Sequence, residues 1–243
     1  MKIKKLTIII PAYNEEKYIL HTIKKILKAE SLGMQKEIII IDDGSTDDTP
    51  ERIKDAVLLV SKKKDVSIIS RLKAKNEGKG AAMKDGFILS TGDIVLVQDA
   101  DMEYSPEDYP TLLFPFIHND ADVVFGSRFI SDRPHRVLYF WHSIMNQFLT
   151  MFSNMLSNLN LTDMETGSKV FKGDLIRTIA PRLSAKRFGF EPEITARIAK
   201  IPQVKIYEVG VSYAGRTYQE GKKIGWIDGV KAIGEIVRYN LFP

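Results

Sequence analysis

The sequence predicts an α/β protein with an open, mostly parallel sheet that is flanked by helices. Short runs of apolar, often β-branched residues alternate with segments of helical periodicity along the first half of the 243-residue chain. The apolar runs are continuous rather than alternating, which indicates strands buried on both faces, as in parallel sheets. A content of 44% hydrophobic and 27% charged residues is typical of a globular protein with a sizeable core.

Five strands and six helices are predicted in chain order. The strands are 6–10, 37–41, 66–70, 93–98 and 121–127, each a run rich in Ile, Val or Leu. The helices are 15–29, 50–62, 78–90, one that starts at 105–108, 137–162 and 225–242. The start at 105–108 has the clearest signal, because "SPED" places a capping serine, a proline and two acids in one turn.

Polar clusters follow three of the predicted strands at the point where each strand ends. "PAYNEE" follows the first strand, "DDGSTDD" the second and "DADME" the fourth. Ligands of open parallel sheets bind beyond the carboxyl ends of the strands. We therefore expect the functional site along this one edge of the sheet.

The acids after the fourth strand suggest a metal site. Asp99, Asp101 and Glu103 occupy alternate positions. If the extended conformation continues past Val97, the three carboxylates point to the same side. Like charges that close raise one another's pKa and need a neutralising partner. Divalent cations such as Mg²⁺ or Mn²⁺ prefer oxygen ligands, so a metal is the expected partner. The alternative interpretation is an acidic turn at the surface.

The predicted helix over 137–162 contains no Asp, Glu, Lys or Arg. Its length would permit a membrane span, but its amide and imidazole side chains would be costly in hydrocarbon; these are His142, Asn146, Gln147, Asn154, Asn158 and Asn160. Arg133 and Arg136 precede it, which favours a helix lying on the headgroup region of a membrane. A core or dimer-interface helix is the alternative. Helix 225–242 offers a similar stripe of Trp226, Val230, Ile233 and Val237. No membrane span is expected.

Composition excludes some functions. The formal net charge of +4 mildly favours anionic partners such as phosphates or an acidic membrane surface, and no nucleic-acid partner is indicated. The chain has no cysteine, so disulfides and thiolate metal sites are excluded. No Gly-x-Gly-x-x-Gly pattern follows the first strand, which argues against a dinucleotide oxidoreductase.

The order of the motifs resembles that of glycosyltransferase family two. The motifs are "IIIPAYNEE", "IIIIDDGSTDDT", "NEGKGAAMKDGF", "GDIVLVQDADMEYSPED" and "VVFGSR". The resemblance spans roughly residues 6–218 and implies the nucleotide-sugar-binding fold called GT-A. We accordingly expect a GT-A domain over 1–218, followed by a basic loop and an amphipathic helix over 219–243. "METGSKVF", "FGFEPEITARIAK" and "GRTYQEGKKIGW" are similar to the branch of dolichyl-phosphate mannose synthases and polyprenyl-phosphate glucosyltransferases.

The resemblance implies roles for individual residues. Asp101 would be the main metal ligand and Asp99 its companion, while Glu103 stands where the mannose synthases often have Gln. Arg128 would contact the diphosphate, and its planar guanidinium suits bidentate phosphate recognition. The residues implied in nucleotide-sugar binding are Pro11, Tyr13, Glu15, Asp43, Asn76, Lys79 and Gly80, with Asp43 accepting a hydrogen bond from a base.

The resemblance further implies an inverting transfer of mannose or glucose, from GDP-mannose or UDP-glucose, to a polyprenyl phosphate at the cytoplasmic membrane face. Arg216, Lys222 and Lys223 would form a loop that orders over the phosphates. A family-two enzyme that glycosylates a hydroxyl is the alternative, and it would need a general base. Asp163 is then the favoured candidate, with Glu191 and Glu193 as others. A non-catalytic binding module and a homo-oligomer also remain open.

Overall fold

The computed structural model describes residues 3–61, 63, 65–130, 136–137, 139–187, 189–215 and 226–242. In these residues the strands form one sheet in the order β3-β2-β1-β4-β6-β5-β7. The strands are β1 (Lys5–Ala12), β2 (Gln35–Asp42), β3 (Val66–Leu72), β4 (Ile94–Val97), β5 (Val123–Ser127), β6 (Lys169–Lys172) and β7 (Ile206–Gly210). Strand β6 is antiparallel to β4 and β5, and the other pairings are parallel. The predicted α/β class and mostly parallel sheet are confirmed.

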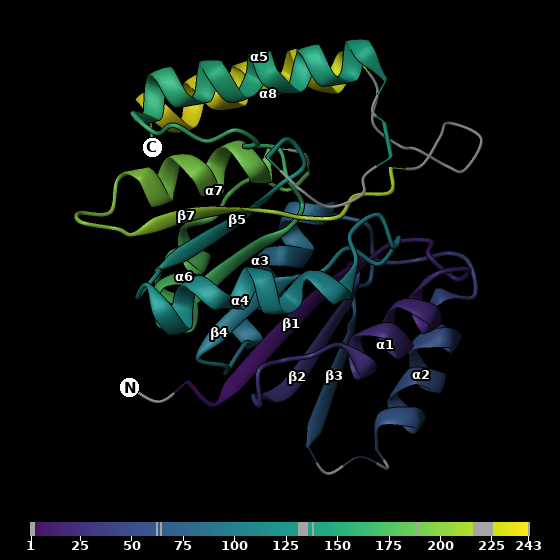
Figure 1. Cartoon of the computed structure of the whole chain (residues 1–243). Coiled ribbons are helices and arrows are strands. Elements are labelled where there is room, and N and C mark those ends of the chain that lie inside the picture. Colours follow the sequence, from purple (N-terminus) through teal and green to yellow (C-terminus); the bar gives the residue numbers. More distant parts are fainter. Residues whose placement is uncertain are drawn as a thin grey trace.

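Helices cover both faces of the sheet (Figure 1). One face carries α1 (Ile19–Lys28), α2 (Thr49–Val60) and α4 (Tyr109–His118), the last preceded by the 3₁₀ turn η1 (Pro106–Asp108). The other carries α3 (Lys79–Leu89), α6 (Gly173–Ile179), the 3₁₀ turn η2 (Ala180–Arg182) and α7 (Phe190–Ala199). Helices α5 (Phe140–Ser157) and α8 (Trp226–Leu241) lie side by side and form an outer layer over α7.

The continuous apolar strands are explained by the two cores. In β1, Ile8 and Ile10 pack against the helices of one face, while Ile9 packs against those of the other. All three side chains are fully buried. Helix α3 approaches β1 closely at Gly86, where a Cβ atom would lie 2.5 Å from Cγ2 of Ile9. The sheet is therefore held from both sides, and the loops at its carboxyl edge have a rigid base.

Helix α5 packs on the domain with one side and exposes large apolar side chains on the other. Its buried residues are Leu149, Thr150 and Ser153, whereas a series of large apolar side chains is exposed to solvent: Phe140, Trp141, Ile144, Phe148, Met151 and Met155. Trp141 is 77% and Met155 71% exposed. Helix α5 therefore has apolar residues on two sides: one side packs on the core of the second face through Leu149, Met145, Phe152 and Leu156, and the other is exposed. None of the helices in the described residues combines the length and the apolar composition that crossing a bilayer requires.

Helix α8 buries a face other than the stripe named from the sequence. Ala232, Ile236 and Tyr239 are buried against the domain, while Val230 of the predicted stripe is 54% exposed. Ile233 and Val237 lie at the border of the contact, and the side chain of Trp226 is outside the described residues. The helix packs on α5 and α7 and contributes to the core of the second face. Within the predicted 219–243 segment, helix α8 therefore packs directly on the preceding domain.

Glu37 gives a testable stability prediction at the amino edge of the sheet. It is 3% exposed and accepts hydrogen bonds from Lys5 Nζ at 2.6 Å, Thr7 Oγ1 at 2.6 Å and both donors of Thr91. Burial alone would raise the pKa of Glu37, but these hydrogen bonds outweigh it, and the pKa lies below its usual value. The ionised form therefore stabilises the fold at neutral pH.

We expect Glu37→Gln to lower the unfolding temperature at pH 7. The difference from the wild type should shrink as the pH falls below about 4.3, the unfolded pKa of Glu, because the wild type then loses the same stabilisation. Thermal unfolding between pH 3 and 7 measures it. Glu51→Gln, on an exposed ion pair with Lys54, is the control and should change little. A difference that stays constant down to pH 3 would contradict this account.

Candidate active site

The first two polar clusters form one wall at the carboxyl edge. The backbone N–H of Asn14 donates to Ser45 Oγ at 2.9 Å, and Asn14 Oδ1 accepts from the N–H of Thr46 at 2.9 Å. The N–H of Glu15 donates to Thr49 Oγ1 at 2.8 Å. The implied nucleoside residues Pro11 and Tyr13 are partly exposed on this wall, whereas Glu15 is buried. The site expected at this edge is therefore assembled from loops that are far apart in sequence.

Asp43 anchors the 76–80 loop. Its carboxylate is almost fully buried and accepts from the backbone N–H groups of Glu77 and Gly78, the latter at 2.6 Å. Lys73 Nζ lies 3.4 Å away. Asp43 therefore positions this loop in the structure, and its contact with a base stays a prediction.

The same loop is fixed by close backbone packing. A Cβ atom at Gly78 would lie 2.3 Å from the carbonyl oxygen of Lys186, and one at Gly80 2.2 Å from that of Ala185. Gly78 also has φ +103°, which favours glycine. Gly80 is buried, and Asn76 is partly exposed at the start of the loop. Lys79 begins α3 and points its ammonium group toward the acids that follow β4.

The three acids after β4 do not share a pleat. The strand ends at Val97, the chain turns at Ala100 and Asp101, and Met102 has a left-handed φ of 64°. The expectation of an extended conformation past Val97 is therefore wrong. Glu103 accepts from the Tyr213 hydroxyl at 2.9 Å, and its N–H donates to Asp101 Oδ1 at 3.2 Å.

Lys79 neutralises Asp99 in the structure. Its Nζ lies 2.8 Å from Asp99 Oδ1 and 3.8 Å from Glu191 Oε1. Burial alone would lower the pKa of Lys79, but Asp99 and Glu191 raise it above the usual value, so the ammonium stays charged. Across the described residues, no three His, Cys, Asp or Glu side chains gather closely enough to hold a metal together.

Asp99 and Asp101 nonetheless suit a divalent ion shared with a substrate. Mg²⁺ is usually held by one or two carboxylates together with substrate phosphates. Both aspartates are partly exposed on one turn. A Cβ atom at Gly167 would lie 2.5 Å from Asp99 Oδ2, so the glycine leaves room for that carboxylate. The donor set is made of oxygens only, which fits Mg²⁺ or Mn²⁺; Glu103, held by Tyr213, would be a weaker third ligand.

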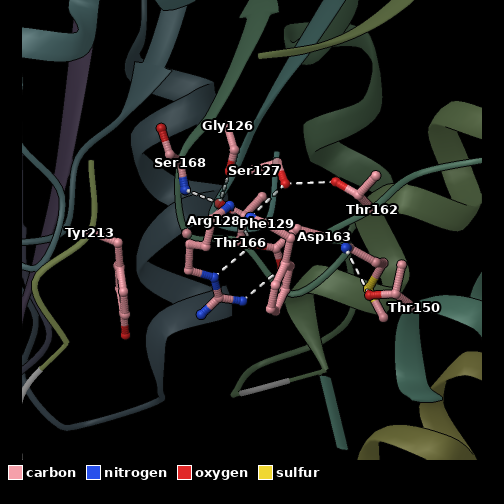
Figure 2. A network of polar contacts seen from close by, with 12 residues as sticks. Gly126, Ser127, Arg128, Phe129, Thr150, Thr162, Asp163, Thr166, Ser168 and Tyr213 are labelled. Carbon is pink, nitrogen blue, oxygen red and sulfur yellow. Dashed lines mark hydrogen bonds and ion pairs between the residues drawn. The ribbon is translucent and has the colours of Figure 1, made fainter. Parts of the chain in front are cut away.

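Arg128 and Asp163 form a buried bidentate pair (Figure 2). Arg128 Nε lies 2.6 Å from Asp163 Oδ2, Nη2 lies 2.7 Å from Oδ1, and the N–H of Arg128 also donates to Oδ2. Asp163 is 0% exposed. The guanidinium carbon lies 5.2 Å from the centre of the Tyr213 ring. Both carboxylate oxygens are engaged, so the geometry favours Asp163 as the residue that orients Arg128 over a role as proton acceptor.

Glu191 and Glu193 are engaged as well. Glu193 is 0% exposed and accepts from the N–H groups of Ser184 and Ala185 and from Arg197. Glu191 forms a short ion pair with Lys169. Neither carboxylate is therefore open to take a proton from a hydroxyl in this arrangement.

Sequence reasoning missed Lys169 and Glu165. Lys169 is 1% exposed and donates to the carbonyl oxygens of Met164 at 3.0 Å and Thr166 at 2.5 Å, in addition to Glu191. Burial and the nearby Glu191 raise the pKa of Glu165 to about 7, against the opposing effect of Lys169 and Arg128. In the sequence, the feature that could have drawn attention to them is a lysine, Lys169, directly before the apolar pair Val170 and Phe171 and four residues after Glu165.

The predicted phosphate-binding loop cannot be placed. Arg216, Lys222 and Lys223 lie outside the described residues, as does Arg133. Arg136 is described: its N–H donates to the carbonyl oxygen of Tyr213 at 2.8 Å, and its Nη1 donates to that of Gly215 at 3.0 Å. The chain that leads into α5 is therefore tied to the residue that stacks on Arg128.

An open α/β sheet carries two aspartates, a lysine and an oriented arginine at its carboxyl edge, which are charges suited to a divalent ion and to phosphate groups. The model of the family "Glycosyl transferase family 2" matches residues 7–177. The chain belongs to this family and is a glycosyltransferase, as the motifs predict.

Relatives of known sequence include enzymes of lipid glycosylation. A dolichyl-phosphate beta-glucosyltransferase of Dictyostelium discoideum is 31% identical over 96% of this chain and 73% of its own length. An uncharacterized protein of Methanocaldococcus jannaschii is 26% identical over 97% of this chain and 92% of its own length. An undecaprenyl-phosphate 4-deoxy-4-formamido-L-arabinose transferase of Salmonella paratyphi B is 40% identical, over 46% of this chain and 33% of that enzyme.

Solved structures confirm the fold. Glucosyl-3-phosphoglycerate synthase of Mycobacterium tuberculosis, in complex with Mn²⁺, uridine diphosphate and phosphoglyceric acid, superposes with a TM-score of 0.67 at 19% identity. The match covers 99% of this chain and 80% of that one. The same enzyme with Mg²⁺ and uridine diphosphate gives a TM-score of 0.68, at 19% identity and with the same shares covered.

The buried pair predicts unequal effects on stability and activity. Arg128→Met should lower the free energy of unfolding by about 3–5 kcal/mol, because it leaves the Asp163 carboxylate buried and unpaired. Adding Asp163→Asn should restore part of this stability while sugar transfer stays lost. Chemical denaturation and a transfer assay measure the two effects. Lys54→Met, at an exposed ion pair, is the control and should cost less than about 1 kcal/mol. A double variant no more stable than Arg128→Met would contradict the pairing argument.

Proposed function

We propose that this glycosyltransferase moves a hexose from a nucleotide diphosphate sugar to the phosphate of a polyprenyl phosphate, with inversion and with a divalent metal. The observation that carries the proposal is the link between Arg128 and the exposed apolar end of α5. Tyr213 stacks on Arg128, the carbonyl of Tyr213 accepts from Arg136, and α5 begins four residues later with exposed Phe140 and Trp141. The guanidinium that would bind phosphate is thus connected, through Tyr213 and Arg136, to the exposed apolar end of α5 that would meet the lipid.

The site residues would share the work of the transfer. Asp99 and Asp101 would hold the metal, which when bound supplies positive charge for the leaving diphosphate. Arg128, held by Asp163, presents its remaining N–H groups to phosphate oxygens. The acceptor phosphate oxygen forms its bond to the anomeric carbon as the bond from that carbon to the diphosphate breaks. No general base is needed, because a phosphate is ionised at neutral pH; this agrees with the engaged state of Asp163, Glu191 and Glu193.

Glucose from UDP-glucose is the first donor to test, and GDP-mannose the second. The Dictyostelium relative, which aligns over nearly the whole chain, is named as a glucosyltransferase of dolichyl phosphate. The structural neighbour binds uridine diphosphate. That neighbour also binds phosphoglyceric acid, which is not a lipid, so transfer to a hydroxyl remains the second candidate. Arg216, Lys222 and Lys223 would contribute charge to either phosphorylated acceptor.

Transfer to a polyprenyl phosphate is directly measurable. Purified protein, Mn²⁺ and labelled UDP-glucose or GDP-mannose should label a polyprenyl phosphate in detergent, and chelation of the metal should abolish the labelling. Asp101→Asn should reduce the rate by about a hundredfold to a thousandfold, as expected for the loss of one preorganised charge stabiliser. Asp55→Asn, on the surface of α2, is the control. Labelling of a soluble hydroxyl acceptor alone would overturn the lipid assignment.

The apolar stripe of α5 would place the enzyme on the cytoplasmic face of a membrane. Phe140→Gln combined with Trp141→Gln should weaken sedimentation with anionic phospholipid vesicles by at least about tenfold, because two large apolar side chains no longer enter the interface. The core is untouched, so the unfolding temperature should not fall.

Leu58→Gln is the matched control, since Leu58 is 67% exposed on α2, away from the stripe. Equal vesicle binding by the double variant and the wild type would show that α5 does not contact lipid. A helix that instead covers a second copy would be detected by a change of mass in solution.

A further inference from the structure

Glu165 is a carboxylate in the active site that has no hydrogen-bond partner on one oxygen. Its Oε1 atom is buried, and no donor of the described residues reaches it. Buried polar atoms are almost always paired in folded proteins, so an unpaired one needs an explanation. Neither the proposed metal site nor the proposed diphosphate contact uses this residue.

The position of Glu165 in the chain places it between the two halves of the site. Asp163, two residues before it, grips Arg128. Gly167, two residues after it, lies against the Asp99 carboxylate. The flanking carbonyl groups of Met164 and Thr166 both accept from Lys169, which fixes the backbone on either side of Glu165. Glu165 thus lies in the short segment that joins the residue orienting Arg128 to the glycine beside Asp99, which is where we expect the donor sugar.

Neighbouring carboxylates of this region have other partners. Asp163 is saturated by Arg128, Glu191 is paired with Lys169, and Glu193 is held by two backbone N–H groups and Arg197. The raised pKa of Glu165, about 7, reflects burial and the nearby negative charge of Glu191. A hydrogen bond donated by a neutral hydroxyl would stabilise the ionised form of Glu165 without adding a charge to the site.

We propose that Glu165 accepts a hydrogen bond from a hydroxyl of the donor hexose and so selects and orients the sugar. The inference rests on the proposed function only in requiring a nucleotide sugar as donor, and it is independent of the acceptor. A buried carboxylate that lacks its hydroxyl partner is left unpaired, which makes such a contact strongly selective. Glu165 is thereby a specificity-determining residue of the donor site.

Calorimetric titration with Mn²⁺ present separates the sugar from the nucleotide. Glu165→Gln and Glu165→Ala should bind UDP as the wild type does, within about twofold, while their affinity for UDP-glucose, or for GDP-mannose against GDP, falls by about tenfold to a hundredfold. Asp174→Asn is the control, because Asp174 is 96% exposed and far in the fold from the site edge. Unfolding temperatures establish that each variant is folded.

Deoxy analogues of the bound donor sugar identify the contact. The wild type should bind one deoxy analogue about tenfold to a hundredfold more weakly than the complete sugar nucleotide. Glu165→Ala should bind that analogue and the complete sugar nucleotide almost equally.

Three results would overturn the proposal. The first is an equal loss of UDP and UDP-sugar affinity, and the second is a deoxy series with identical losses in wild type and variant. The third is unchanged donor binding with transfer alone abolished, which would make Glu165 a proton acceptor for a hydroxyl. If the wild type binds no nucleotide sugar, the proposed function itself fails, which is a distinct outcome.

Discussion

The bidentate pair between Arg128 and Asp163 is the interaction on which the site depends. It joins the end of β5 to the segment that precedes β6, and β6 is the strand that reverses direction in the sheet. The same segment brings Gly167 against Asp99 and carries the buried, unpaired Oε1 atom of Glu165. A buried pair of this kind contributes little net stability but fixes geometry, because either partner alone would be an uncompensated charge. The pair therefore sets the position of the Arg128 guanidinium at the edge of the sheet where the acids follow β4.

Glycines provide the second constraint. At Gly78 and Gly80 the 76–80 loop lies against the backbone of residues 185–187, at distances that no side chain would permit. Asp43 holds the same loop from the opposite side through two N–H groups. The start of α3, and with it Lys79, is consequently placed by backbone contacts. Because the backbone at Lys79 is fixed, its side chain loses less conformational freedom when it forms the ion pair with Asp99.

The sequence allowed the first half of the fold to be predicted almost completely. Runs such as "IIII" in β2 can only be buried on both sides, and the polar clusters after them mark one edge. The second half was harder. Strand β6 is four residues long and carries Lys169, whose burial is possible only because Glu191 and two carbonyl groups surround it. Strand β7 lies at the edge of the sheet, and its residues "IYEVG" form neither a continuous apolar run nor a regular alternation, so its sequence signal is weak.

For the site, too, the sequence predicts some features and not others. The motifs named Arg128, Asp99 and Asp101, and the structure places all three just beyond strands β4 and β5 at the carboxyl edge. The partner of Arg128, the anchoring role of Asp43 and the break in the strand at Val97 depend on contacts between distant segments. The alternation of acids suggested a pleat, whereas the left-handed Met102 shows a turn. Side-chain spacing alone cannot distinguish the two.

The exposed apolar side of α5 has a consequence for how the enzyme would find the proposed lipid acceptor. Its outward residues do not support the core, so they are free to vary without affecting folding. Attachment through them would confine diffusion to two dimensions, the same plane in which a long isoprenoid carrier moves. Replacing the outer residues with charged ones would return the catalyst to a three-dimensional search while leaving its chemistry intact.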